Sequence, residues 1–340
     1  LKADDRLVYP FREEYADILE WADKKTPSWK TKYYAALFYW SKQQNEKAEK
    51  YFNECGQTPD SYSFYLTRGT FMQRTGKNAE QDLLKALSMN QNNWRPYHIL
   101  YNYYSSLNRY DKALDITVRA MKVAGDMYII SFDHAQALLY NRKYDECIKI
   151  LKKIVILPHE GAGSGRTVWK TANLLNALKY YSGNQTGKAL VFANNTYMWP
   201  ENLGVGRPYR VDERAENFIS SMIQEKRNNK KLSSELLTKV ADYNDGKPVG
   251  NSSLNFLSVM ALKKLGRHDE SVSYFEKWIE KNRNAKVVEW AKLIMEGKKS
   301  EADAILKSIS DDGEGTPWNP AGTDNDFRLI NEIVQKISDL

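Results

Sequence analysis

The most regular feature of the chain is a small residue that recurs within apolar stretches at an interval near 34 residues. Ala113, in Asn108-Arg-Tyr-Asp-Lys-Ala113, is followed 34 residues later by Cys147, in the similar string Asn141-Arg-Lys-Tyr-Asp-Glu-Cys147. A small residue lets two helices approach closely where they cross. The pattern predicts paired helices with such a residue in each second helix: Ala48, Ala79, Ala113, Cys147, Ala189, Ser271 and Ala302.

A second residue follows each of these small residues four positions later, on the same helical face. These residues are Phe52, Leu83, Thr117, Leu151, Ala193, Phe275 and Leu306, of which Thr117 breaks the apolar rule. Twelve residues before the small residue, the first helix has Ala36, Ala135 and Ala177 in three units, but Tyr101 in the third unit. The spacing of 31 between Ala48 and Ala79 predicts a shortened inner turn in the second unit.

Turn-forming residues fall between the predicted helices, as paired helices require. They occupy 42–45, 75–78, 183–187, 265–268 and 296–300, and Pro59, Pro158 and Pro200 follow second helices, where a proline does no harm. Phe11 to Lys24 reads as an amphipathic helix with Tyr15, Ile18, Leu19 and Ala22 on one stripe. The region 324–338 reads as a last helix that closes the open end of the stack.

A helix-turn-helix unit of 34 residues is typical of tetratricopeptide (TPR) repeats, which this chain resembles. The expected fold is all-α: one right-handed superhelical solenoid of about eight units over residues 1–340, with a capping helix at each end. The expected divisions are an N-terminal helix (1–28), five units (29–209), a degenerate unit (210–250), two further units (251–312), and a loop with the capping helix (313–340). The degenerate unit still has two helical patterns, at 214–225 and 232–243.

Composition is that of a folded chain, with 42% hydrophobic and 27% charged residues. The net charge of +7 suggests RNA as a possible partner, a hypothesis that predicts binding that weakens strongly as the salt concentration rises. However, the most basic stretch, 207–247, has nine Lys or Arg against seven Asp or Glu, so we expect no nucleic acid. No apolar run reaches the roughly 20 residues of a membrane span, and a chain that begins with Leu1 is expected to be a processed product or a piece of a longer one.

Catalytic and metal-binding patterns are weak, so we expect no enzyme, no cofactor and no metal. The string Gly161-Ala-Gly-Ser-Gly-Arg-Thr167 imitates a phosphate-binding loop, but its glycine spacing is short and Arg166 replaces the lysine. The preceding run, 154–157, is expected to be helical rather than a strand. The four histidines, His98, His134, His159 and His268, are scattered, and Cys55 and Cys147 are expected to pack without a disulfide.

Two further strings carry a closer resemblance. Pro158-His-Glu-Gly-Ala-Gly163 and Trp199-Pro-Glu-Asn-Leu-Gly-Val-Gly206, together with the start Tyr9-Pro-Phe-Arg12, resemble the C-terminal TPR half of large, uncharacterised bacterial proteins. In that family a β-rich domain of unknown function precedes the repeats. The usual Trp of the first string is His159 here. The resemblance implies that the signature residues either dock this missing domain or hold an irregular turn: His159, Glu160, Gly161, Trp199, Pro200, Glu201, Asn202, Gly204 and Gly206.

The predicted function is a non-enzymatic scaffold that holds a protein or peptide, or its own β-rich domain, on the concave face of the first helices. Counting positions within the units places seven residues on that face: Lys30, Tyr33, Trp40, Arg95, His98, Asn102 and Gln136. Arg95, His98 and Asn102 share one stripe suited to a carboxylate. The alternative is an accessory domain of a carbohydrate-active protein, with a glycan site near His159 and Trp199. The expected location is the bacterial cell envelope or periplasm, with the cytoplasm left open.

Overall fold

The computed structural model describes residues 5, 8–158, 163–311 and 326–337. Over these residues the chain is all-α and has no strand, as an α solenoid of paired helices requires. The predicted all-α fold is confirmed. The chain divides into two compact units, unit 1 (Leu1–Ile130) and unit 2 (Ser131–Leu340), which are described separately. A single continuous array over the whole chain stays a prediction.

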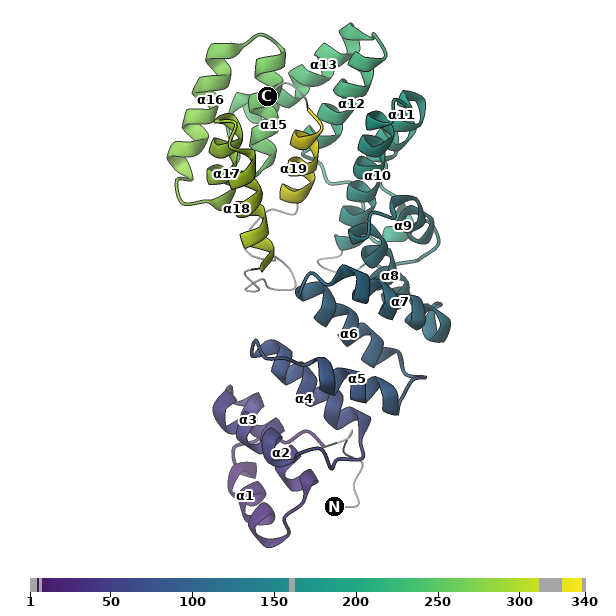
Figure 1. Ribbon diagram of the computed structural model, residues 1–340, viewed down its shortest axis with the longest axis vertical. Helices are drawn as coiled ribbons and strands as arrows, with labels where there is room; N and C mark the ends of the chain where they lie inside the picture. Colours follow the sequence, from purple (N-terminus) through teal and green to yellow (C-terminus); the bar gives the residue numbers. More distant parts are fainter. Residues whose placement is uncertain (1–4, 6–7, 159–162, 312–325, 338–340) are drawn as a thin grey trace. The chain divides into compact units, whose positions relative to one another are not determined.

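Unit 1 holds a leading helix and three helix pairs (Figure 1). The helices are α1 (Tyr15–Lys25), α2 (Trp29–Ser41), α3 (Asn45–Glu54), α4 (Tyr62–Arg74), α5 (Glu80–Met89), α6 (Trp94–Ser106) and α7 (Tyr110–Ala124). Each pair packs tightly within itself, and a cluster of buried aromatic rings joins the first two pairs. Phe52 and Phe71 lie 5.0 Å apart in this cluster, and Tyr33 meets Phe64 edge-on at 5.3 Å.

Unit 2 continues with α8 (Tyr128–Tyr140), which begins just before the boundary, and contains five pairs. The other helices are α9 (Tyr144–Leu151), α10 (Ser164–Ser182), α11 (Thr186–Asn195), the short η2 (Glu201–Leu203), α12 (Arg214–Lys226), α13 (Lys230–Ala241), α14 (Tyr243–Gly246), α15 (Leu254–Lys264), α16 (His268–Lys281), α17 (Lys286–Met295), α18 (Lys299–Asp311) and α19 (Phe327–Gln335). One hydrophobic core runs from α10 to α19.

The turns within the pairs share one structure. In the described part of the chain, eight of them contain a left-handed residue with φ between 55° and 76°: Gln43, Gly76, Asn108, Arg142, Asn184, Asn228, Gly266 and Gly297. The amide of the next residue donates back to a carbonyl of the first helix at 2.7 to 2.9 Å, as in Gln44 N to Tyr39 O and Arg267 N to Leu262 O. This is the Schellman arrangement, which satisfies carbonyls that a helix end would otherwise leave unpaired.

In every pair but the second, the second helix starts from this turn in a fixed register. The small residue predicted from spacing lies five positions after the left-handed residue in six pairs, and all seven predicted small residues are at most 1% exposed. The same interval from Asn228 leads to Ser233, which is 5% exposed and gives the degenerate unit the small residue that the sequence pattern missed. Thr117, the exception in the pattern, is buried and donates its hydroxyl to Leu114 O at 2.9 Å.

The second pair corrects one expectation. Its turn is longer than the others rather than shorter, because α5 begins four residues after Gly76. Ala79 is therefore the N-cap of α5 rather than a residue inside the helix. The close approach on the facing helix moves to Gly69, where a Cβ atom would lie 2.6 Å from Leu83 Cδ2. Gly69 lies seven residues before Gly76, the interval found in the other first helices, whereas Ala79 follows Gly76 by three residues instead of five, so only the second helix of this pair is shifted.

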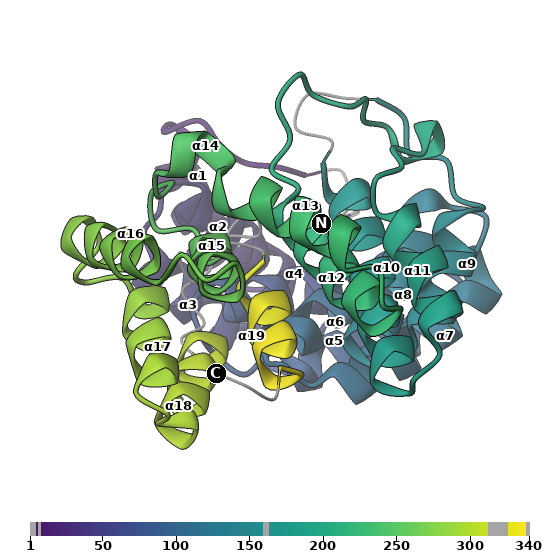
Figure 2. The ribbon, with the colours of Figure 1, turned by 90° about the horizontal axis from the view of Figure 1, so that it is seen from above.

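The ends of the array also differ from their predictions. Helix α1 begins at Tyr15 rather than at Phe11, and its predicted stripe is only partly buried: Leu19 packs on the core of unit 1, whereas Ile18 is 56% exposed. At the other end, α19 contacts the last pair, as a cap should, but it also packs against α15 and α10. Figures 1 and 2 show α19 in yellow beside α15, on the side that faces α10 and α12. The predicted loop at 313–322 lies outside the described residues.

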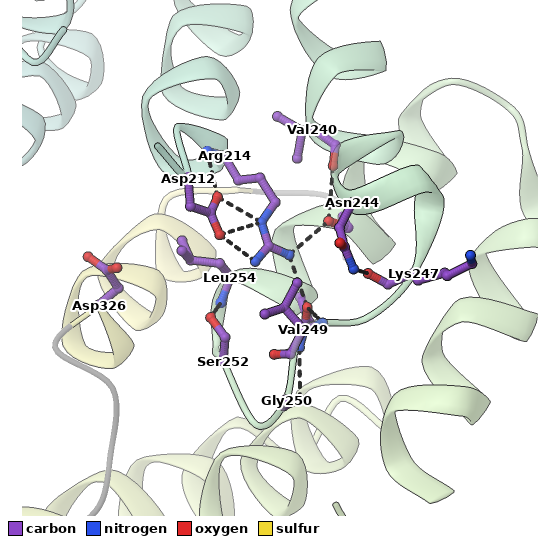
Figure 3. A network of polar contacts seen from close by, with 12 residues as sticks. Asp212, Arg214, Val240, Asn244, Lys247, Val249, Gly250, Ser252, Leu254 and Asp326 are labelled. Atoms are coloured by element: carbon purple, nitrogen blue, oxygen red, sulfur yellow. Dashed lines mark hydrogen bonds and ion pairs between the residues drawn. The ribbon is translucent and has the colours of Figure 1, made fainter. Parts of the chain in front are cut away.

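A buried arginine fixes the link between α13 and α15 (Figure 3). Arg214, 1% exposed, binds the carboxylate of Asp212 at 2.7 to 3.1 Å and donates to Asn255 Oδ1 at 3.0 Å. Asn255 in turn donates to Val249 O at 3.1 Å and accepts from Val249 N at 3.0 Å. These bonds satisfy the polar groups of an irregular link, which explains why a charged residue can be buried between helices.

Candidate binding groove on unit 1

A groove of about 360 Å³ crosses the three first helices of unit 1. Its lining comes from α2 (Trp40), α4 (Leu66, Thr67 and Thr70) and α6 (Trp94, Arg95, His98 and Ile99). On α4 and on α6 these residues recur at intervals of one and four, so each helix presents one face. Trp40, Arg95 and His98, predicted from the sequence as ligand-binding residues, therefore lie in one groove.

Two tryptophan rings form the aromatic part of the groove, and each has a guanidinium over it. Trp40 meets Phe71 edge-on at 5.5 Å, and the Arg74 guanidinium lies 5.7 Å from the Trp40 ring centre. Arg95 lies 4.9 Å from the Trp94 ring centre. Neither arginine makes an ion pair with another described residue, so both keep their charge available to a ligand.

Charge is distributed unequally between the first and second helices of unit 1. Helices α2, α4 and α6 contain Lys30, Lys32, Arg68, Arg74 and Arg95 and no Asp or Glu, whereas α3, α5 and α7 all carry acidic residues. Two of these five cations are neutralised by neighbours: Arg68 by Asp82 at 2.6 Å, and Lys32 by Asp23 at 2.8 Å. Arg74 and Arg95, which form no ion pair with a described residue, therefore give the groove a positive potential.

Three of the remaining predicted residues lie beside the groove or in the core. Asn102 lies one turn beyond His98 and its Nδ2 atom is 3.1 Å from His98 Nε2. Lys30 lies over the Trp29 ring at 5.6 Å, near the start of α2. The placement of Tyr33 on an accessible face is wrong, because its ring fills the core and is 3% exposed. Its hydroxyl donates to Thr67 Oγ1 at 3.2 Å, and burial raises the pKa of Tyr33 to about 12.

Gln136 belongs to a different unit from the other six predicted residues. It is half-buried on α8 of unit 2 and does not line the groove. The sequence prediction also missed the whole α4 contribution to the groove, namely Leu66, Thr67 and Thr70. The two-residue shift marked by Gly69 explains this omission, because counting from Ala79 misplaces the faces of α4.

The second predicted group lies in unit 2, where two irregular segments, 152–158 and 199–206, run beside each other. We call this region the junction. Asn202 Nδ2 donates to Leu151 O at 2.8 Å and to Ile154 O at 2.7 Å, and Ile156 N donates to Asn202 O at 2.8 Å. Gly204 has φ 76°, and a Cβ there would lie 2.7 Å from Ile156 O. Asn202 and Gly204 thus hold an irregular turn, one of the two roles expected for them.

The junction also corrects the expectation for 154–157, which are not helical, because α9 ends at Leu151. Arg166 of the phosphate-loop imitation lies 4.5 Å from the centre of the Trp199 ring and donates to Thr196 O at 2.5 Å, so its side chain is committed to the fold. Pro200 is half-buried, and Glu201 and Gly206 are exposed. His159, Glu160 and Gly161 lie outside the described residues.

Buried charges gather behind the junction, on α10 and α12. Glu216 is 1% exposed, neither of its carboxylate oxygens accepts a hydrogen bond from another described residue, and burial raises its pKa to about 7. Burial lowers the pKa of Arg166. Burial alone would lower the pKa of Lys170. The negative charges of Asp326, which is 3.0 Å away, and of Glu216 have the larger effect, so the Lys170 pKa is raised. This cluster belongs to unit 2 and is separate from the groove.

Neither a metal-binding cluster nor a membrane-spanning helix occurs among the described residues. Among them, no group of three or more His, Cys, Asp or Glu side chains could hold a metal ion. Within the same residues, no helix is both long and apolar enough to cross a bilayer. Cys55 and Cys147 are buried free thiols, and burial raises the pKa of each to about 12. Their predicted burial as packing residues is confirmed.

Comparisons with known proteins give one family match. No curated protein sequence matches the chain with significance. Among similar solved structures, Pseudomonas aeruginosa pilF has 12% identity and a TM-score of 0.36, over 64% of this chain and 93% of its own. Yeast Tom70 has 16% identity and a TM-score of 0.38, over 88% of this chain and 60% of its own. Residues 252–284, which span the pair α15 and α16, match the family described as tetratricopeptide repeat.

Proposed function

We propose that the protein is a non-enzymatic scaffold whose unit 1 groove binds an extended segment of a partner protein. The observation that carries the proposal is the groove itself, in which three consecutive first helices contribute to one apolar, tryptophan-lined surface. The tetratricopeptide match in unit 2 supports a fold that presents first helices to a ligand. An extended segment can contact several helices at once, which a small compact ligand cannot.

The chemistry of the groove selects the segment. Trp40 and Trp94 offer flat faces to an aliphatic or aromatic side chain. The Thr67 hydroxyl accepts from Tyr33 and can still donate to a ligand, and the Thr70 hydroxyl donates to Leu66 O and can still accept from a ligand. Arg74 and Arg95, each stacked on one of these tryptophans, favour a carboxylate on either side of that apolar residue. We therefore infer an acidic peptide with at least one bulky apolar residue.

A peptide-display selection on the full chain tests this function. Recovered sequences should carry Asp or Glu next to an aromatic or aliphatic residue, and binding should weaken by about tenfold or more in Arg95→Glu, because one charge-assisted contact is replaced by repulsion. Trp94→Ala should weaken binding through loss of apolar contact. Lys85→Glu is the matched control, since Lys85 is exposed on α5 and outside the groove lining.

The proposal fails if the selected peptides bind Trp94→Ala and Arg95→Glu as well as they bind the wild-type chain. The glycan alternative gains no support from the comparisons or from the described part of the junction. Docking of an N-terminal β-rich domain remains a proposal that rests on the sequence resemblance, for which Glu201 and Gly206 are the exposed described residues.

A further inference from the structure

The first helices of unit 2 are covered where those of unit 1 are open. In α12 every residue from Arg214 to Gln224 is buried, and in α15 every residue from Leu254 to Leu262 is buried. By contrast, α2, α4 and α6 leave a groove between them. Helix α19 supplies cover in unit 2, because it packs against both α10 and α15.

The seating of α19 is that of an amphipathic helix in a groove. Its apolar face is almost completely buried, with Phe327 at 2%, Ile330 and Ile333 at 0% and Val334 at 1% exposure. Phe327 meets Trp290 of α17 edge-on at 5.1 Å. Apolar anchors at intervals of three and four residues are how a helix binds in a hydrophobic groove.

Polar contacts fix the direction and register of α19 along its length. At its N-cap, the Asp326 carboxylate forms an ion pair with Lys170 of α10, with 3.0 Å between Lys170 Nζ and Asp326 Oδ1. In its middle, Asn331 Oδ1 accepts from Trp290 Nε1 at 3.1 Å, and both side chains are buried. Near its end, Glu332 pairs with Arg142 in the turn between α8 and α9 at 3.0 Å. These partners come from different helix pairs, so α19 touches the unit as a bound peptide would.

We propose that this face of unit 2 is a binding site for an amphipathic helix of a partner protein, and that α19 occupies it in cis. The partner helix would have an acidic N-cap residue, bulky apolar residues at the places of Phe327, Ile330, Ile333 and Val334, and Asn at the place of Asn331. It enters by displacing α19. This site is distinct from the unit 1 groove and does not depend on the function proposed for it.

The test of this proposal must take into account that α19 is covalently attached next to the site and competes with any added peptide. A covalently attached ligand acts at an effective concentration on the order of millimolar, so a free peptide competes poorly with intact α19. The probe is a fluorescently labelled peptide with the sequence of residues 324–338. The intact chain should bind it at least tenfold more weakly than a full chain in which Phe327→Asp and Ile330→Asp keep α19 out of its site.

Charge exchange then tests the seating. Lys170→Glu in the α19-ejected chain should weaken the peptide about tenfold, and a peptide with Asp326→Lys should recover most of the loss. A peptide with Ile330→Asp should not bind any form. A role of Lys170 in folding alone would not give this recovery. Should the ejected chain fail to fold, a specific protease site introduced between residues 312 and 325 allows α19 to be cut free after folding, and the labelled peptide should then exchange into the site.

Three results would overturn the proposal. The first is no peptide binding to either the ejected or the cleaved chain. The second is equal binding of the wild-type and Ile330→Asp peptides. The third is a dimer of the wild-type chain by light scattering that the peptide dissociates, because the natural occupant would then be α19 of a second copy.

Discussion

Replacement of Glu216 by glutamine should make the chain more stable at neutral and alkaline pH. The Glu216 carboxyl is 1% exposed, and burial raises its pKa from 4.5 to about 7. Lys170 and Arg166 favour the charged form, but they only partly offset the loss of hydration. The folded protein therefore binds a proton on this group at a pH at which the unfolded chain does not.

The sign and size of the effect follow from this difference. A raised carboxyl pKa means that ionisation costs folding free energy, fully above pH 7 and not at all below 4.5. At 1.36 kcal/mol for each pKa unit, the full cost is about 3 kcal/mol, of which about 2 to 3 kcal/mol appears between pH 5 and pH 8. Glutamine has the same shape and no charge, so the advantage of Glu216→Gln over wild type should grow by that amount over this range.

Urea unfolding followed by circular dichroism at several pH values between 5 and 8 measures this difference. Glu225→Gln is the matched control, because Glu225 lies on the same helix, is exposed, and pairs at the surface with Lys264 at 3.3 Å. It should follow the wild-type pH profile. A stability difference between Glu216→Gln and wild type that stays constant from pH 5 to pH 8 would refute the reasoning, because the carboxyl would then titrate alike in both states.

Three further substitutions test the packing. Asn202→Ala should lower the free energy of unfolding by about 2 kcal/mol, because two carbonyls at and just after the C-terminus of α9 lose their hydrogen-bond donor. An unchanged melting temperature in thermal unfolding would show that the junction does not depend on these bonds. Arg68→Met should lower the free energy of unfolding by about 3 to 5 kcal/mol, because it leaves Asp82 buried and unpaired. In urea titrations, the double variant with Asp82→Leu should regain most of this loss. A double variant as unstable as the single one would contradict this account. Gln43→Gly should stabilise unit 1 by up to about 1 kcal/mol, since Gln43 has φ 60° and is exposed, and a lower melting temperature would argue against strain at that turn.

The paired helices could be predicted from the sequence because their signals are local. Small residues and turn residues recur at fixed intervals, and all seven predicted small positions are buried. The degenerate unit was harder to recognise for a physical reason. Helix α12 keeps an apolar stripe, but its polar side is buried as well, with Arg214, Glu216, Asn217 and Gln224, and the sequence pattern gives no sign of this second buried face. Its polar residues depend on partners far away in the sequence.

The candidate groove was predicted in part. Trp40, Arg95 and His98 could be placed by counting positions, since α2 and α6 keep the common register. Leu66, Thr67 and Thr70 could not, because Ala79 lies three rather than five residues after Gly76, and counting back from it misplaces the faces of α4 by two residues. The seating of α19 against α10 was also out of reach, because the two helices are distant in the sequence and only the folded unit brings Asp326 to Lys170.

The uniform turns have a consequence for how such a chain can change. Because the left-handed residue and the small residue are five positions apart in every pair but the second, an added or lost residue in these turns would rotate one helix against its partner and open the core. Between pairs the chain is free of this requirement, and the connections range from 125–127 to 196–213. Insertions, reporter domains and new chain ends are therefore best tolerated between the pairs. A longer connection there changes the packing of neighbouring helix pairs but leaves the core of each pair intact.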